Sequence, residues 1–116
     1  MIAHIVLFEP KPELTKDERR QFLQSLREAV AAIADVQQVR IGRTFSVGLM
    51  PQQNVGASTY SFAAILDFAD RDALDRYLQH PSHDELRRLF WQGCQATVIA
   101  DAAMFPLASE ETELLA

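Results

Sequence analysis

His83 is the side chain of this 116-residue chain best placed to accept a proton. It belongs to the segment Tyr-Leu-Gln-His-Pro-Ser-His at 77–83, in which Pro81 suits the first turn of a helix. The positive end of the helix dipole disfavours a cationic ring there, so His83 should stay neutral near pH 7, as a general base must. The alternative is a positioning role, in which His83 caps the start of the helix and packs the turn.

His4 and Tyr77 are expected to point toward the interior. His4 shares a strand face with apolar residues, which predicts either a hydrogen-bonded core histidine or a donor at the floor of a pocket. Tyr77 lies at helical spacing with Leu74 and Leu78, so its ring is core material. Its hydroxyl then needs a partner, and His83 is a candidate. His80 is expected to serve the turn itself.

Other chemistries leave no pattern in the sequence. The proline between His80 and His83 spoils a clean helical pair of metal ligands, so no metal site is expected. There is no glycine-rich phosphate loop, no Gly-x-Ser-x-Gly elbow and no Cys–His nucleophile arrangement. The single cysteine, Cys94, reads as a small buried hydrophobe. We therefore predict no cofactor.

The elements that would position these residues follow from periodicity and capping signals. Thr15 and Glu18 form a capping box, Asp70 caps a second helix, and Gly93 ends a third helical stretch that starts near Pro81. Apolar runs or alternation predict four strands, and a proline- and glycine-containing stretch predicts an exposed loop. The strands are expected at 2–8, 36–47, 60–68 and 96–105, and the loop at 48–58. The order is that of an α+β, ferredoxin-like βαββαβ fold, a four-stranded antiparallel sheet with helices on one face.

One copy of such a fold leaves apolar surface uncovered. The strands at 2–8 and 96–105 carry apolar side chains on both faces, but the helices cover only one. Leaving roughly 600 Å² of this surface in water forgoes about 15 kcal/mol, although association costs offset much of that gain. We therefore expect a homodimer through the helix-free face of the sheet, whose two sheets form a dimeric α+β barrel.

The totals exclude several classes of partner. The 16 acids outnumber the 11 Lys and Arg residues for a net charge of −5, which argues against a nucleic-acid surface. No segment has the ~20 consecutive apolar residues of a membrane span, and no leader pattern is seen, so a cytoplasmic protein is expected. Residues 1–105 are expected to form one domain, and 106–116 an exposed acidic extension. Six residues are predicted to line an internal cavity or else to fill it: Val6, Phe8, Phe22, Leu26, Phe90 and Trp91.

The opening Met-Ile-Ala-His-Ile-Val-Leu-Phe, and the segment 77–83 followed by Phe90-Trp91, resemble the stress-responsive α/β-barrel (Dabb) family. The resemblance spans about residues 1–105 and implies a dimeric α+β barrel. One plant branch of the family cyclises a linear tetraketide by aldol condensation without a cofactor, and its working groups match His4, Tyr77 and His83. A further pocket tyrosine of that branch falls near Leu26 here.

Three functions follow as hypotheses. The first is a homodimer that binds a small, largely apolar molecule in a pocket within each subunit. The second is a cofactor-free cyclase or lyase in which His83 is the base and His4 and Tyr77 polarise a carbonyl. The third is a structural, stress-linked dimer whose pocket is packed shut. An open cavity beside His4, Tyr77, His83 and Trp91 would favour the first two.

Overall fold

The computed structural model describes residues 1–46 and 60–108. Its elements are β1 (Ile2–Pro10), α1 (Lys16–Ala31), β2 (Gln38–Arg43), β3 (Phe62–Phe68), α3 (Arg71–Gln79), α4 (Pro81–Gly93) and β4 (Cys94–Ala103). The predicted loop over 48–58 and most of the predicted extension over 106–116 lie outside the described residues. Within the described ranges, no helix combines the length and the apolar character needed to span a membrane.

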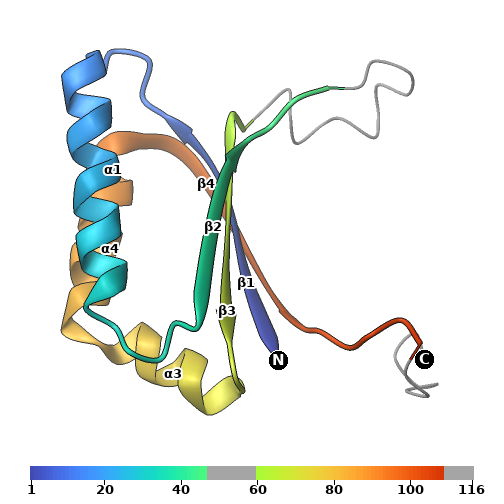
Figure 1. The fold of residues 1–116 in the computed structure, drawn as a ribbon. Helices are drawn as coiled ribbons and strands as arrows, with labels where there is room; N and C mark the ends of the chain where they lie inside the picture. Colours follow the sequence, from blue (N-terminus) through green and yellow to red (C-terminus); the bar gives the residue numbers. More distant parts are fainter. Residues whose placement is uncertain (47–59, 109–116) are drawn as a thin grey trace.

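The four strands form one antiparallel sheet in the order β2-β3-β1-β4. The helices lie together on one face of this sheet, and the other face carries none of them (Figure 1). This is the ferredoxin-like arrangement expected from the order of elements. It puts β1 in the interior of the sheet, so His4 lies at the centre of the molecule with β4 directly beside it.

The ends of the strands differ from the sequence prediction. β2 ends at Arg43 rather than at Val47, because its last partner is Phe62, the first residue of β3. β4 begins at Cys94 rather than at Ala96, because Cys94 already pairs with Pro10 across a register shift in β1. Alternation of side chains marks a strand, but the partner strand decides where pairing stops.

The helices begin at the predicted caps. Thr15 accepts from the Glu18 backbone amide at 3.1 Å, and the Glu18 carboxylate accepts from the Thr15 amide at 3.0 Å, which completes the capping box. Asp70 accepts from the Ala73 amide at 2.8 Å at the start of α3. α4 ends at Gly93, where the backbone passes so close to the Phe22 ring that an added Cβ would lie 3.0 Å from it.

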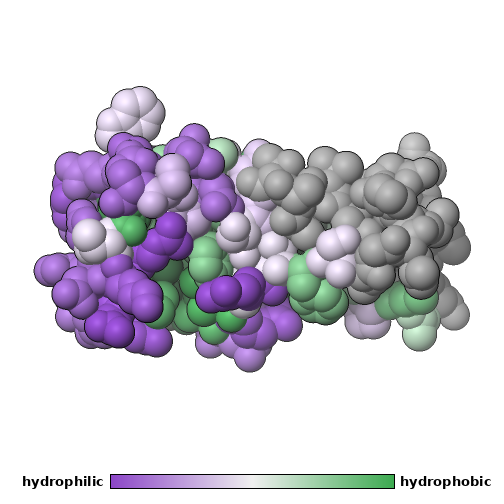
Figure 2. Space-filling model, turned by 90° about the horizontal axis from the view of Figure 1, so that it is seen from above, coloured by the Kyte–Doolittle hydropathy of each residue, from purple (hydrophilic) through white to green (hydrophobic). Residues whose placement is uncertain are grey.

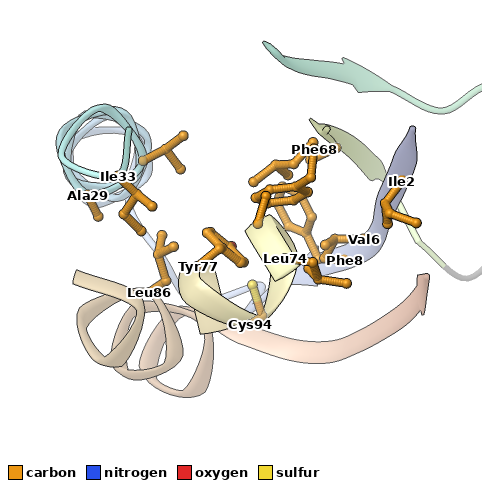
Figure 3. Close-up of a cluster of buried hydrophobic side chains, with 14 residues drawn as sticks. Ile2, Val6, Phe8, Ala29, Ile33, Phe68, Leu74, Tyr77, Leu86 and Cys94 are labelled. Carbon is orange, nitrogen blue, oxygen red and sulfur yellow. The ribbon is translucent and has the colours of Figure 1, made fainter. Parts of the chain in front are cut away.

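Side chains alternate between the two faces of the sheet. Ile2, His4, Val6 and Phe8 point toward the helices and are all buried. They join side chains from α1, α3, α4 and β3 in one core, part of which Figure 3 shows. The opposite face holds Ile5 and Leu7 of β1, whose register neighbours are also apolar: Ile65, Ala63, Ala100 and Val98. The face without helices is thus mostly apolar.

Candidate functional site

Tyr77 and His83 meet because the helix breaks between them. In one continuous helix, a spacing of six residues would leave them about 120° apart around the helix axis, on different faces. Instead α3 ends at Gln79 and α4 begins at Pro81, and His80 joins the two with an extended backbone. The ring centroids of Tyr77 and His83 lie 4.8 Å apart, edge to face. Both rings therefore face the same side of the molecule.

The cap of α4 is His80 and not His83. The His80 Nδ1 atom accepts from the Ser82 backbone amide at 3.0 Å, so its ring holds the first turn of α4. This confirms the structural role expected for His80 and leaves the His83 ring without a capping bond. The hydrogen bond considered between Tyr77 and His83 is not formed, since the Tyr77 hydroxyl has no hydrogen-bond partner among residues 1–46 and 60–108.

His4 is held by a residue that the sequence reasoning missed, Asp101. The two are direct partners in the register of β1 and β4, and the His4 Nδ1 atom hydrogen-bonds to the Asp101 carboxylate. An ionised carboxylate only accepts, so Nδ1 carries the proton and Nε2 remains free to interact elsewhere. The available signal was the position of Asp101, an acid inside the otherwise apolar run at 98–103.

Tyr77 links the two histidines. Its ring centroid lies 5.5 Å from that of His4, also edge to face, and 5.0 Å from that of Phe68, which is fully buried. Burial, and then the charge of Asp101, raise the pKa of the Tyr77 hydroxyl to about 12. Tyr77 therefore stays protonated and can donate a hydrogen bond across the neutral range of pH.

The pKa of His83 is shifted in the opposite direction to that of Tyr77. Burial is the main cause that lowers the pKa of its imidazole below the usual 6.5, and the charges of Arg87 and His4 add to this, against a smaller effect of Asp84. The sequence argument expected the same direction from the helix dipole alone. Among the side-chain nitrogen and oxygen atoms of the described residues that are themselves shielded from solvent, the His83 Nδ1 atom is the one that lacks a hydrogen-bond partner. A neutral ring with an unsatisfied nitrogen suits a ligand or a reacting group.

These side chains border an open cavity of about 1000 Å³ between α4 and β4, here called the histidine cleft. Val6, Leu86, Phe90 and Ile99 give it an apolar wall. Trp91 lines the rim with its side chain 85% exposed. The cleft is defined by five residues: His4, Tyr77, His83, Trp91 and Asp101.

The single cavity expected from the sequence is divided into three. Val6, Phe90 and Trp91 line the histidine cleft, whereas Leu26 lines a cavity of about 470 Å³ between α1 and the sheet, which Val6 and Phe90 also border. Phe8 and Phe22 line a third space of about 390 Å³ near the start of α1. The division arises because α1 and α4 pack together, with the Phe22 and Phe90 rings 5.5 Å apart.

The charged groups around the cleft are mostly engaged with one another. Arg87 pairs with Asp84 at 3.0 Å, and Arg88 pairs with Glu85, both within the surface of α4. No group of three or more His, Cys, Asp or Glu side chains within 1–46 and 60–108 is arranged to hold a metal ion. The candidate chemistry of the site thus rests on two imidazoles, a phenol and a carboxylate.

Comparison with known proteins agrees with this fold. A dimeric ferredoxin-like protein of unknown function from Thermobifida fusca has a TM-score of 0.68 and 26% identity, over 89% of this chain and 90% of that one. A Dabb family protein with a ferredoxin-like fold from Mesorhizobium loti has a TM-score of 0.72 and 25% identity, over 90% and 97% of the two chains.

An enzyme has the same fold. The hydroxynitrile lyase from Passiflora edulis has a TM-score of 0.71 and 18% identity, over 90% of this chain and 96% of that one. None of the curated proteins matches the chain significantly. The family model described as Stress responsive A/B Barrel Domain matches residues 2–104.

Proposed function

The chain belongs to the stress-responsive A/B barrel domain family, and we propose that it is a homodimer whose histidine cleft binds a small, largely apolar molecule. The observation that carries this proposal is an open cavity lined by His83, whose Nδ1 atom is buried in the protein and lacks a hydrogen-bond partner. A buried polar atom without a partner costs free energy, which a ligand atom that hydrogen-bonds to it would recover.

The cleft favours a ligand with a polar group at one end. Its walls are largely apolar, and one cluster of polar groups in the lining is formed by His4, Tyr77, His83 and Asp101, apart from the polar side chains that α4 and β4 also contribute. The Tyr77 hydroxyl would donate to a carbonyl oxygen, since its raised pKa keeps it protonated. A hydroxyl or enol on the same ligand would pair with His83. The open volume argues against a structural dimer with a pocket that is packed shut.

A second candidate is cofactor-free catalysis, favoured by the neutral state of His83. In this scheme His83 takes a proton from the carbon next to a carbonyl, and Tyr77 donates a hydrogen bond to the enolate oxygen that forms. The enolate carbon then bonds to a second carbonyl carbon of the same molecule, and the protonated His83 returns its proton to the new alkoxide. Asp101 fixes the tautomer of His4, which orients the substrate. The Passiflora edulis lyase is an enzyme with this fold.

The dimer is supported by the helix-free face of the sheet. Ile5, Leu7 and Ile65 are only half buried in one subunit, and Val98 is 43% exposed. An apolar sheet face of this kind is stabilised when a second copy covers it. The similar protein from Thermobifida fusca is described as dimeric. Because the cleft lies on the helix side, it would stay accessible in such a dimer.

The test is to titrate β-polyketones, such as heptane-2,4,6-trione, into the wild type, His83→Ala and Tyr77→Phe. The matched control is Asp75→Ala, on the exposed surface of α3. We expect saturable binding that each cleft variant weakens about tenfold and the control leaves unchanged. Formation of a cyclised product, lost by about a hundredfold or more in His83→Ala, would establish the catalytic version. Absence of binding, or binding indifferent to both cleft variants, would refute the proposal.

A further inference from the structure

A second groove lies between α1 and β2, at the opposite edge of the sheet from the histidine cleft. The cavity of about 470 Å³ and the space of about 390 Å³ both include Leu23 and Ile41 in their linings, so they adjoin. We call the combined space the α1–β2 groove. None of the catalytic candidates except Tyr77 borders it, and Tyr77 contributes to the wall it shares with the histidine cleft.

The floor of the α1–β2 groove is apolar along its whole length. At the end where α1 begins, Phe8 stacks on Phe62 with centroids 5.5 Å apart and lies 6.2 Å from Phe22. Figure 2 looks onto this end and shows hydrophobic surface between hydrophilic side chains. Farther along, aliphatic side chains from α1, β2 and β3 continue the floor: Leu26, Val30, Val39, Ala64 and Leu66.

Arginines gather at the mouth of the groove. Arg19, Arg20 and Arg43 all line it, although the chain as a whole carries a net charge of −5. Arg43 lies over the Phe62 ring, 5.6 Å from its centroid, and neither Arg43 nor Arg19 has a carboxylate partner in the part of the chain that the structure describes. Arg20 pairs with Asp17 at 3.0 Å, but both side chains are highly exposed, so this pair is weak.

The nearby acids keep their negative charge, but none within the described residues forms an ion pair with Arg19 or Arg43. Asp17 is engaged with Arg20, and the Glu18 carboxylate accepts from the Thr15 amide in the capping box. The Glu9 carboxylate accepts from the Ser61 amide at 2.6 Å. Two guanidinium groups are therefore left to bind an anion, and their planar donor geometry fits a carboxylate.

We propose that the α1–β2 groove binds a single-chain amphipathic carboxylate, with the carboxylate at Arg19 and Arg43 and the apolar chain along the floor toward Val39. The two adjoining cavities, of about 470 and 390 Å³, leave room for one such chain, and the phenylalanine floor removes that chain from water. The site is independent of the proposed histidine cleft function, and it stays open if a second copy covers the helix-free face.

The test uses calorimetric titration with octanoate, decanoate and dodecanoate, all below their micelle concentrations, and with decanol as the uncharged control. Affinity should rise about threefold per added methylene, and decanoate should bind about tenfold more tightly than decanol. Arg19→Gln and Arg43→Gln should each weaken decanoate binding about fivefold. Arg71→Gln, which makes the same charge change at the start of α3, should leave it unchanged.

Amide shifts in NMR spectra locate the bound acid. Shifts confined to the start of α1, β2 and β3 support the proposal, whereas shifts around His4 and His83 would overturn it. Equal affinity for decanoate and decanol, or for the wild type and both arginine variants, would also overturn it. A phospholipid could present the same chemistry, so vesicles of phosphatidylglycerol form a second arm. Binding to these vesicles without binding to the free acids would refute a site for single-chain acids.

Discussion

Protonation at the candidate site is set by where each ring lies. His83 is half-buried at the start of α4, with Arg87 close by, and both features disfavour its cationic form. Tyr77 is buried against Phe68, so its hydroxyl resists ionisation. His4 gains a fixed tautomer from Asp101. At neutral pH the Tyr77 phenol can thus donate a hydrogen bond while the His83 imidazole is neutral, and their ring centroids lie 4.8 Å apart. Binding or enolising a carbonyl compound needs this combination of groups.

The lowered pKa of His83 predicts a pH dependence of stability. The folded chain binds a proton at His83 less readily than the unfolded chain does, so this ring contributes stability that is complete above about pH 6.5 and lost as the pH falls through its lower folded pKa. In urea titrations between pH 8 and 5.5, the free energy of unfolding should fall less in His83→Gln than in the wild type. NMR titration should place the His83 midpoint below 6.5, and a midpoint at or above that value would contradict the assignment.

At the scale of single residues, the sequence indicated which side chains come together but not all of their contacts. His4, Tyr77 and His83 do come together, and His80 serves the turn as expected. Asp101 was missed because its role depends on the register between β1 and β4, two strands 97 positions apart at this pair. The sequence also did not predict that the lining residues divide among three cavities. This division depends on the packing of α1 against α4, a contact between distant segments.

Secondary-structure elements position the site through their ends. The capping box at Thr15, the cap at Asp70 and the stop at Gly93 are all local signals, and all were predictable from neighbouring residues. The ends of β2 and β4 were not, because they are set by distant partners across the sheet. Local chemistry fixes where helices begin, and long-range pairing fixes where strands end.

The cap at His80 can be tested directly. His80→Ala removes the acceptor for the Ser82 amide and should lower the free energy of unfolding by about 1 kcal/mol, measured by urea denaturation. His80→Asn keeps an acceptor in the same place, so it should match or exceed the stability of the wild type. Equal loss in the alanine and asparagine variants would show that the ring contributes by packing and not by capping.

The whole molecule is a layered structure with two unlike sides. The helix side holds the core and all three cavities, while the opposite side is an apolar sheet. The fold class was predictable because the order and type of elements leave few topologies. The sizes and linings of the cavities were not, since they depend on gaps between packed side chains that no periodicity records.

The proposed dimer predicts that a charge on the helix-free face separates the subunits. Leu7→Glu places a carboxylate among Ala63 and Val98, so the variant should become a monomer in sedimentation equilibrium. Val39→Glu makes a comparable change on the helix side of β2, at a residue 47% exposed, and should leave the mass unchanged. A wild type that sediments as a single subunit would rule out the dimer.

The joint at His80 has a consequence for how freely this chain can vary. Tyr77 lies three residues before His80, and His83 lies three residues after it. The distance between their rings is therefore set by six residues of backbone and not by contacts between distant segments. Lengthening α3 before Tyr77 or α4 after His83 leaves the pair intact. One residue inserted between them would swing one ring about 100° around its helix axis, out of reach of the other. The contact between Tyr77 and His83 therefore requires this short interval to keep its length.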